Sequence, residues 1–350
     1  MKIDWKRVCK PQPDGYDSHA IAYLLNQKYG WTKRKPTSKF TICDGEVAVV
    51  RDPLVDPALV PPDDPMLDGY DRWTPEIAAN LDPYLRTWED GHLMLKLFLD
   101  EFWPKWSKIM GEGANGCSSG HFEMKSATKT HRKEEGMFVN AVYVTINSMQ
   151  GCAEGIYHEV GHARLEALGM DIDDHDYSLI LNTSEELYDS PIRRDKKRPM
   201  SAVIQAIYSW IVFGENDIQC AKLPGNLINA SHYLIGNIPK IEDGLVEIRK
   251  HVRYTPEGKD FLDSYFEWGE SIVERAKVIC KQAYGPEEYE KNYARAAAYK
   301  EQQATSMKDI FDRLAKEGML RPDGTHKSNE ELEAERLAKK ALNTGTSSPA

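Results

Sequence analysis

The stretch Met149-Gln-Gly-Cys-Ala-Glu-Gly-Ile-Tyr-His158-Glu159-Val-Gly-His162-Ala-Arg-Leu-Glu-Ala-Leu168 is the starting point for interpreting the chain. Its apolar residues Ile156, Val160 and Leu165 lie on or near one helical face. Gly169 follows as a typical stop, because glycine readily adopts the left-handed conformation that ends many helices. The pattern therefore predicts a helix over residues 149–168.

This predicted helix contains an HExxH motif, His158-Glu159-Val160-Gly161-His162. Residues four positions apart share one face of a helix, so both imidazoles can bind a single metal ion. The alternative is a chance pentapeptide with two surface histidines. The helical context and the apolar flank favour the metal site.

Two stretches predict β-structure. Residues 137–147 are rich in β-branched and aromatic residues, which suit a strand. Residues 40–50 contain two β-prone runs joined by Asp44-Gly45, a pair typical of a tight hairpin turn. The proline-rich stretch 52–68 is expected to be an irregular connection.

Most other segments predict helices. A helical pattern starts at Thr74-Pro75-Glu76, and residues 84–106 are expected to form one long helix with Leu93, Leu97, Phe98 and Phe102 on a buried face. The downstream helices are expected over residues 200–213, 218–235, 240–251, 255–284 and 286–317, the fourth with a Thr-Pro-Glu start.

These elements predict an α+β fold that is predominantly α-helical, with a small β-hairpin or sheet element and the HExxH motif on a central helix. We expect three parts: an N-terminal region, 1–110, packed on the catalytic part; a catalytic domain, 111–320; and a charged, partly disordered tail, 321–350.

Composition excludes several classes of function. The 350 residues contain 45 Lys and Arg against 55 Asp and Glu, and this net charge of −10 argues against nucleic-acid binding. No apolar stretch is long enough to span a membrane and no signal peptide is visible, so we expect a cytoplasmic protein. The six cysteines are scattered, as free thiols would be. The glycine-rich stretch 111–120 lacks the Gly-Lys-Ser/Thr of a phosphate-binding loop.

The third metal ligand separates the possible chemistries. A catalytic zinc ion takes three protein ligands and a water, with the motif glutamate as general base, whereas a non-haem Fe(II) oxygenase takes two histidines and typically one carboxylate. The spacing after His162 excludes the metzincin pattern. Glu186 is our preferred third ligand, ahead of His175 in the acidic stretch 171–176.

The segment Ser190-Pro-Ile-Arg193-Arg194-Asp-Lys-Lys-Arg198-Pro199 concentrates positive charge in an otherwise acidic chain. A guanidinium group binds a carboxylate through two parallel hydrogen bonds, so Arg193 or Arg198 suits a dicarboxylic co-substrate such as 2-oxoglutarate, or a substrate carboxylate. The alternative is an ordinary basic surface turn.

The order of these blocks resembles the 2-oxoglutarate-dependent HExxH-type peptide β-hydroxylase family over residues 115–265. The matching blocks are Ser118-Ser119, residues 138–147, the HExxH motif, Ser190-Pro191-Ile192-Arg193, Arg198-Pro199, Tyr208 and Thr255-Pro256-Glu-Gly258. The resemblance implies binding of Fe(II) and 2-oxoglutarate and hydroxylation of unactivated carbons, commonly on ribosomally made peptides. It also makes Tyr208 a candidate catalytic residue.

The chain departs from the family pattern at three places. Ile192 stands where the family tends to have Trp, and one residue is inserted before Arg198-Pro199. Gln205 replaces a histidine of the family. If that histidine is a metal ligand, Gln205 would be a weaker neutral donor; otherwise it can still hydrogen-bond a ligand or substrate.

We therefore expect an Fe(II)/2-oxoglutarate-dependent oxygenase that hydroxylates, desaturates or cyclises a peptide or amino-acid-like substrate in natural product biosynthesis. His158 and His162 would bind iron, with Glu186 or Gln205 completing the site and Glu159 as an additional ligand or a neighbour of one. The alternatives are a zinc metallopeptidase in which Glu159 is the general base, and a catalytically inactive peptide-binding protein.

Overall fold

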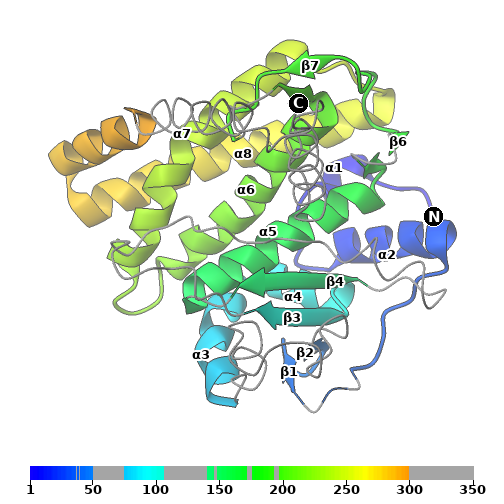
Figure 1. Cartoon of the computed structure of the whole chain (residues 1–350), viewed down its shortest axis with the longest axis horizontal. Coiled ribbons are helices and arrows are strands. Elements are labelled where there is room, and N and C mark those ends of the chain that lie inside the picture. The colour runs from blue at the N-terminus through cyan, green and yellow to red at the C-terminus, as the bar shows by residue number, and fades with distance from the viewer. Residues whose placement is uncertain are drawn as a thin grey trace, which may run out of the picture. The chain divides into compact units, whose positions relative to one another are not determined.

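The computed structural model describes residues 1–36, 38, 40–49, 75–105, 140–145, 148–171, 176–192 and 197–298 (Figure 1). Nearly all of them belong to one compact unit, Met1–Ile192 with Lys197–Ala297. A second unit, Arg193–Lys196 with Ala298–Ala350, lies almost wholly outside the described residues. The expected domain boundaries after residues 110 and 320 also lie outside them.

Helices make up 67% of the described residues, so the predicted α+β fold of mainly helical character is confirmed. The helices are α1 (Trp5–Val8), α2 (Tyr16–Tyr29), α3 (Pro75–Arg86), α4 (Glu89–Phe98), α5 (Met149–Ala167), α6 (Met200–Cys220), α7 (Leu227–His251) and α8 (Pro256–Tyr284). A further helical stretch covers 286–298.

The strands are β1 (Thr41–Ile42), β2 (Val47–Val49), β3 (Glu101–Lys105), β4 (Ala141–Thr145), β5 (Met170–Asp171), β6 (Asp176–Tyr177), β7 (Leu187–Tyr188) and β8 (Arg198–Pro199). The first four form one sheet in the order β1-β2-β3-β4, antiparallel between β1 and β2 and parallel across the other two pairs. The remaining four form two short antiparallel ribbons, β5-β6 and β7-β8.

The predicted hairpin is confirmed. Asp44 and Gly45 have φ angles of 60° and 85°, and the Glu46 amide donates to the Cys43 carbonyl. Positive φ at both central residues matches the twist of the two strands, which explains why Asp-Gly suits this turn.

The single long helix predicted over residues 84–106 is wrong. The chain leaves the helical conformation between α3 and α4, and Phe102 lies in β3 instead of on a helix. The spacing of Phe98 and Phe102 suggested one face, but parallel pairing of β3 with β4 recruits the second residue into the sheet, where it is fully buried. Tertiary pairing here overrides the local helical pattern.

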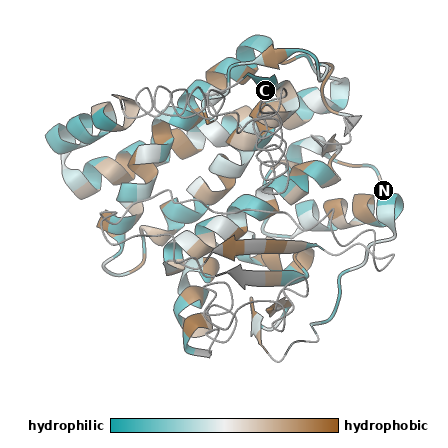
Figure 2. Cartoon of the chain, viewed as in Figure 1, coloured by the Kyte–Doolittle hydropathy of each residue, from teal (hydrophilic) through white to brown (hydrophobic). Residues whose placement is uncertain are grey.

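The helix that carries HExxH, α5, lies between β4 and α6 (Figure 1). Two glycines of α5 let its neighbours pack closely against it, β4 at Gly155 and α6 at Gly161. A Cβ at Gly155 would come within 2.4 Å of a Val144 methyl group, and one at Gly161 within 3.2 Å of the Ser209 backbone. Figure 2 shows apolar residues on the strands beneath α5. The predicted helix and its stop are confirmed, and Gly169 has φ +84°.

The downstream helices differ from prediction in their ends. α6 continues to Cys220, and the chain then turns before α7 begins at Leu227. α7 runs through Pro239 without the break expected there, because its flanking apolar residues are buried in the core. α8 starts as predicted, with the Thr255 hydroxyl accepting a hydrogen bond from the Gly258 amide.

Two further expectations can be compared with the structure. Among the described residues, no helix has the length and apolarity needed to cross a membrane. Five cysteines are buried free thiols, as expected: Cys9, Cys43, Cys152, Cys220 and Cys280. The sixth, Cys117, lies outside the described residues, as do the glycine-rich stretch and the proline-rich connection.

Candidate metal centre

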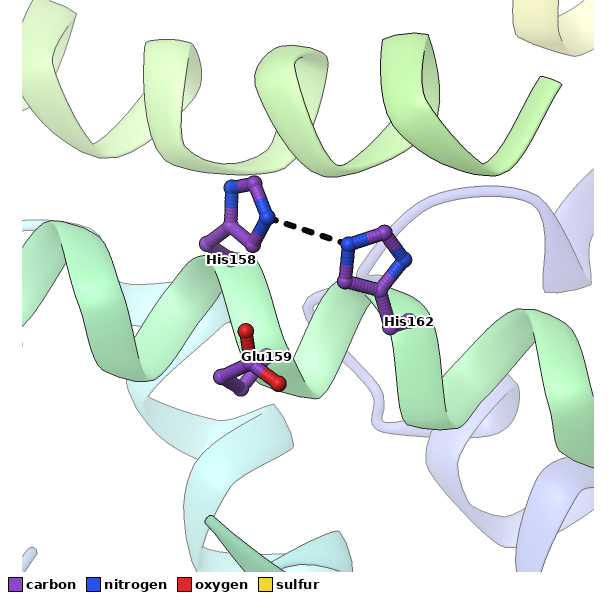
Figure 3. A group of neighbouring side chains, drawn as sticks. All are labelled: His158, Glu159 and His162. Atoms are coloured by element: carbon purple, nitrogen blue, oxygen red, sulfur yellow. Dashed lines mark hydrogen bonds between the residues drawn. The ribbon is translucent and has the colours of Figure 1, made fainter. Parts of the chain in front are cut away.

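The two motif histidines converge, as their spacing predicts. His158 Nε2 and His162 Nε2 lie 3.0 Å apart on the side of α5 that faces α6 (Figure 3). Both side chains are partly exposed, so a ligand can reach them. Together with Glu159 they place their donor atoms within 4.8 Å of one another, which makes a group that could hold a metal ion.

Gln205 on α6 sets the orientation of His162. Its amide nitrogen donates to the Met170 carbonyl at 2.5 Å, which turns Oε1 toward His162 Nδ1 at 2.8 Å. His162 Nδ1 therefore carries the proton and donates a hydrogen bond to Gln205. The lone pair is then on His162 Nε2, which accepts a hydrogen bond from His158 Nε2 here and could instead bind a metal. The position that departs from the family pattern thus contacts a histidine ring nitrogen.

Both histidines are poised to be neutral at pH 7. Burial is the largest cause that lowers the pKa of His158 well below its usual value, with the charge of His162 second. Burial also lowers the pKa of His162 to about 4; the Gln205 hydrogen bond opposes this and the Arg198 charge adds to it. Only neutral imidazole has a lone pair to give to a metal, so these nitrogens suit ligation.

The distance between the imidazole nitrogens can be compared with coordination geometry. Two nitrogens bound to one ion at about 2.1 Å lie about 3.0 Å apart at a right angle and about 3.4 Å apart at the tetrahedral angle. The two rings form an N–H···N hydrogen bond at 3.0 Å, and this separation is close enough for both nitrogens to bind one ion at either angle. The donor set therefore fits a divalent transition metal.

Glu159 lies on a different side of α5 from the two rings but stays within the same group (Figure 3). Its side chain is buried, and burial is the main cause that raises its pKa to about 8, followed by the charge of Glu166. A buried carboxyl group with a raised pKa can hold or release a proton near neutral pH.

The structure does not bring Glu186 into this group. It precedes β7, and its carboxylate accepts a hydrogen bond from Arg253 at 2.6 Å and one from the Thr183 amide. The carboxylate is therefore already used in an ion pair. Our preferred third ligand is thus not part of the cluster, and the alternative, His175, lies outside the described residues.

Tyr208 is also placed away from the motif's donor group. It is fully buried, its hydroxyl donates to the Cys9 carbonyl at 2.6 Å, and it accepts from Arg164 Nε at 3.2 Å. Burial raises its pKa to about 12. These contacts describe a structural tyrosine rather than the catalytic residue that the resemblance implies.

Of the two candidate arginines, Arg198 is close enough to lower the pKa of His162 by its charge. It lies in β8, immediately before α6, and is partly buried. Arg193 lies outside the described residues.

Sequence reasoning missed a row of side chains beside His158. The Phe213 ring stacks on the His158 ring with centroids 5.6 Å apart, and Trp210 follows 5.1 Å from Phe213. Lys240 of α7 places its ammonium 4.1 Å from the Trp210 ring centroid. The i, i+3 spacing of the two aromatics was visible in the sequence, but their partners on α5 and α7 were not.

A cavity of about 710 Å³ lies elsewhere in the same unit, and neither motif histidine lines it. Its lining includes Trp88, Trp268, Lys222 and an ion pair between Glu215 and Arg275. We therefore locate the candidate site by its donor atoms rather than by this cavity. No protein-family model matches the chain, and no curated protein matches it either.

Proposed function

We propose that the protein is an Fe(II)/2-oxoglutarate-dependent oxygenase that acts on an unactivated C–H bond of a peptide or amino-acid-like substrate. The observation that carries the proposal is the pair of neutral imidazoles 3.0 Å apart, with a tautomer set by Gln205. Two imidazole ligands leave several positions of a six-coordinate ion free for a keto acid and oxygen. The family resemblance supports the same reaction.

Each described residue has a definite role in this proposal. His158 and His162 hold the metal through Nε2, and Gln205 keeps the His162 ring in place. Glu159 supplies the carboxyl group of the donor cluster in place of Glu186, and a bound metal would displace its proton. Arg198 adds positive charge at the His162 end, which favours an anionic ligand. Bound Fe(II) with 2-oxoglutarate would supply the oxidising power for hydroxylation, desaturation or cyclisation.

A zinc metallopeptidase is the second candidate, because Glu159 has the raised pKa of about 8 expected of a general base or acid. Glu186, the third ligand expected for either metal, is in an ion pair with Arg253, so the peptidase would also need another ligand. A catalytically inactive peptide-binding protein is the third. A cytoplasmic setting, where thiols stay reduced, agrees with the buried free cysteines.

Anaerobic reconstitution with Fe(II) tests the proposal. We expect the iron-loaded protein to bind 2-oxoglutarate and convert it to succinate in the presence of oxygen and candidate peptides or amino acids. His162→Ala should abolish the turnover, whereas His232→Ala, at an exposed histidine of α7, should not. If zinc-loaded protein cleaves peptides, Glu159→Gln abolishes that cleavage, and iron gives no turnover, the peptidase replaces our proposal.

A further inference from the structure

The cavity of about 710 Å³ is lined by neither motif histidine and has no part in the proposed function. Its lining comes from four places: the chain after α1, the start of α4, the end of α6 and one face of α8. A volume of this size suits a small organic ligand. Lys10 and Glu89 in the lining are exposed, so the cavity opens to solvent and a ligand can enter it.

The buried part of the lining is held in place by Glu215 of α6. Its carboxylate accepts two hydrogen bonds from Arg275, at 2.8 and 2.5 Å, one from Gln219 at 2.7 Å and one from the Trp268 indole nitrogen at 3.2 Å. The ring of Trp88 lies beside that of Trp268, with centroids 6.4 Å apart. Two aromatic rings in fixed positions therefore form a preorganised surface, and the charges of the buried ion pair balance each other.

Three other carboxylates of the lining are not balanced in this way. The side chains of Glu89, Asp90 and Glu267 make no ion pair or hydrogen bond with any residue that the structure describes. Burial is the largest cause that raises the pKa of Asp90, followed by the negative charges of Asp17, Glu215 and Glu89. Exposed carboxylates alone would be an ordinary solvated edge, but these lie over a cavity that contains two tryptophans.

The lysines of the lining do not neutralise these carboxylates. Lys222 donates to the Gln219 side chain. Lys10 makes no ion pair within the described residues, and its charge affects the pKa of Asp90 less than each of the negative charges that oppose it. The potential at Asp90 therefore favours a further positive charge.

We propose that this cavity binds an organic cation, a primary amine or guanidinium group carried on an aliphatic chain. The charged group lies among Glu89, Asp90 and Glu267, and the chain lies along Trp88 and Trp268. Carboxylates attract the charge, and tryptophan is the aromatic residue that best stabilises a cation.

An inorganic ion fits this place less well than an organic cation. A metal ion needs oxygen ligands that converge on it at about 2.0–2.6 Å. Among the described residues, His158, Glu159 and His162 are the group whose donor atoms converge closely enough, and the carboxylates of the cavity form no such group. The site is therefore independent of the candidate metal centre and of the proposed function.

Calorimetric titration of the full-length protein tests the inference. The probes are spermidine, N-acetyl-lysine methylamide and its uncharged analogue N-acetyl-norleucine methylamide. Asp90→Asn should weaken binding of the preferred amine about five- to tenfold, and Asp90→Glu should retain it within a few-fold. Lys10→Met removes a competing cation and should tighten binding. Glu89→Gln should weaken binding, whereas the matched control Glu287→Gln, at an exposed glutamate outside the cavity, should not. His162→Ala should bind the amines as the wild type does.

The probes separate two sources of the cationic group. Tighter binding of spermidine indicates a free polyamine, and tighter binding of the lysine derivative indicates a basic side chain of a peptide. Because the chain has a net charge of −10, a general attraction for cations would be weakened equally by Glu89→Gln and Glu287→Gln. Such equal effects, no binding of either amine at millimolar concentration, unchanged binding by folded Asp90→Asn, or equally tight binding of the uncharged analogue overturns the inference.

Discussion

Helix α5 carries two polar groups with opposite properties. On one side, Arg164 donates to Asp17 at 2.6 Å, to the Val8 carbonyl and to the Tyr208 hydroxyl, and Asp17 also accepts from the Gln12 amide. On the other side, His158 and His162 form a hydrogen bond to each other, His162 also donates to Gln205, and both rings remain partly exposed. The first group holds the N-terminal helices on α5 and α6; the second keeps its ligand atoms available.

The difference shows how structural polar residues can be told from ligand-binding ones on the same helix. A buried charge whose donors are paired stabilises a single packing arrangement, and removing its partner is costly. A polar group whose donors or acceptors are only partly used gains by binding something else. The same reasoning separates Tyr208, which is engaged in the Arg164 network, from Lys240, which makes no ion pair with any residue that the structure describes.

The largest expected effect is the loss of stability when the Arg164–Asp17 ion pair is broken. Arg164→Met leaves the Asp17 carboxylate buried without its partner, so we expect the free energy of unfolding to fall by about 3–5 kcal/mol. Urea unfolding followed by circular dichroism measures it. Adding Asp17→Asn should recover part of the loss; a loss below 1 kcal/mol in the single variant would mean that this pair does not hold the fold.

A second prediction concerns how stability depends on pH at another buried contact between α5 and α6. Asp217 of α6 accepts from Gln150, and burial is the main cause that raises its pKa from 3.8 to about 6. A carboxyl group with a raised pKa stabilises the fold fully below pH 4, and this contribution disappears as pH rises through 6. Asp217→Asn should remove this pH dependence, so that stability curves of variant and wild type diverge between pH 4 and 7; parallel curves would contradict the assignment.

The variant Gln205→Leu tests whether Gln205 orients His162 for metal binding. Loss of the hydrogen bond to His162 Nδ1 frees the ring and its tautomer, so metal affinity should fall about 10- to 100-fold. Competition with a chelator measures the affinity. Gln205→Glu keeps an acceptor at this position and should restore most of it. Unchanged affinity in Gln205→Leu would show that Gln205 does not orient the ligand.

The smallest expected effect is on stability at Lys240. Lys240→Met removes an ammonium that has no ion pair within the described residues, so the free energy of unfolding should stay within about 1 kcal/mol of the wild type or rise. Thermal and urea unfolding give the value. A loss as large as that of Arg164→Met would mean that Lys240 is structural, which is the opposite of our interpretation.

The sequence predicted features that depend on local spacing. The HExxH helix, its glycine stop, the Asp44-Gly45 hairpin and the Thr255 cap each depend on residues a few positions apart, and all are found. Features that depend on distant pairing were missed. Phe102 joined a strand because β4 pairs with β3, and α7 continued through Pro239 because its neighbours are buried.

At the candidate metal centre, too, the sequence predicted local features but not contacts between distant residues. His158 and His162 are placed by one helix, so their convergence was predictable. Glu186 was chosen by its distance along the chain, but Arg253, 67 residues further on, takes its carboxylate. Gln205 was recognised as important without its partner, and Lys240 was not recognised, because a single lysine in a helix gives no sequence signal.

X-ray absorption of the anaerobic, iron-reconstituted protein, compared with His162→Ala, tests the central claim most directly. Our account predicts one six-coordinate Fe(II) per chain with two imidazole ligands in the wild type, and loss of the bound iron in the variant. A site without imidazole, an ion enclosed entirely by protein ligands, or iron retained unchanged by His162→Ala would contradict it.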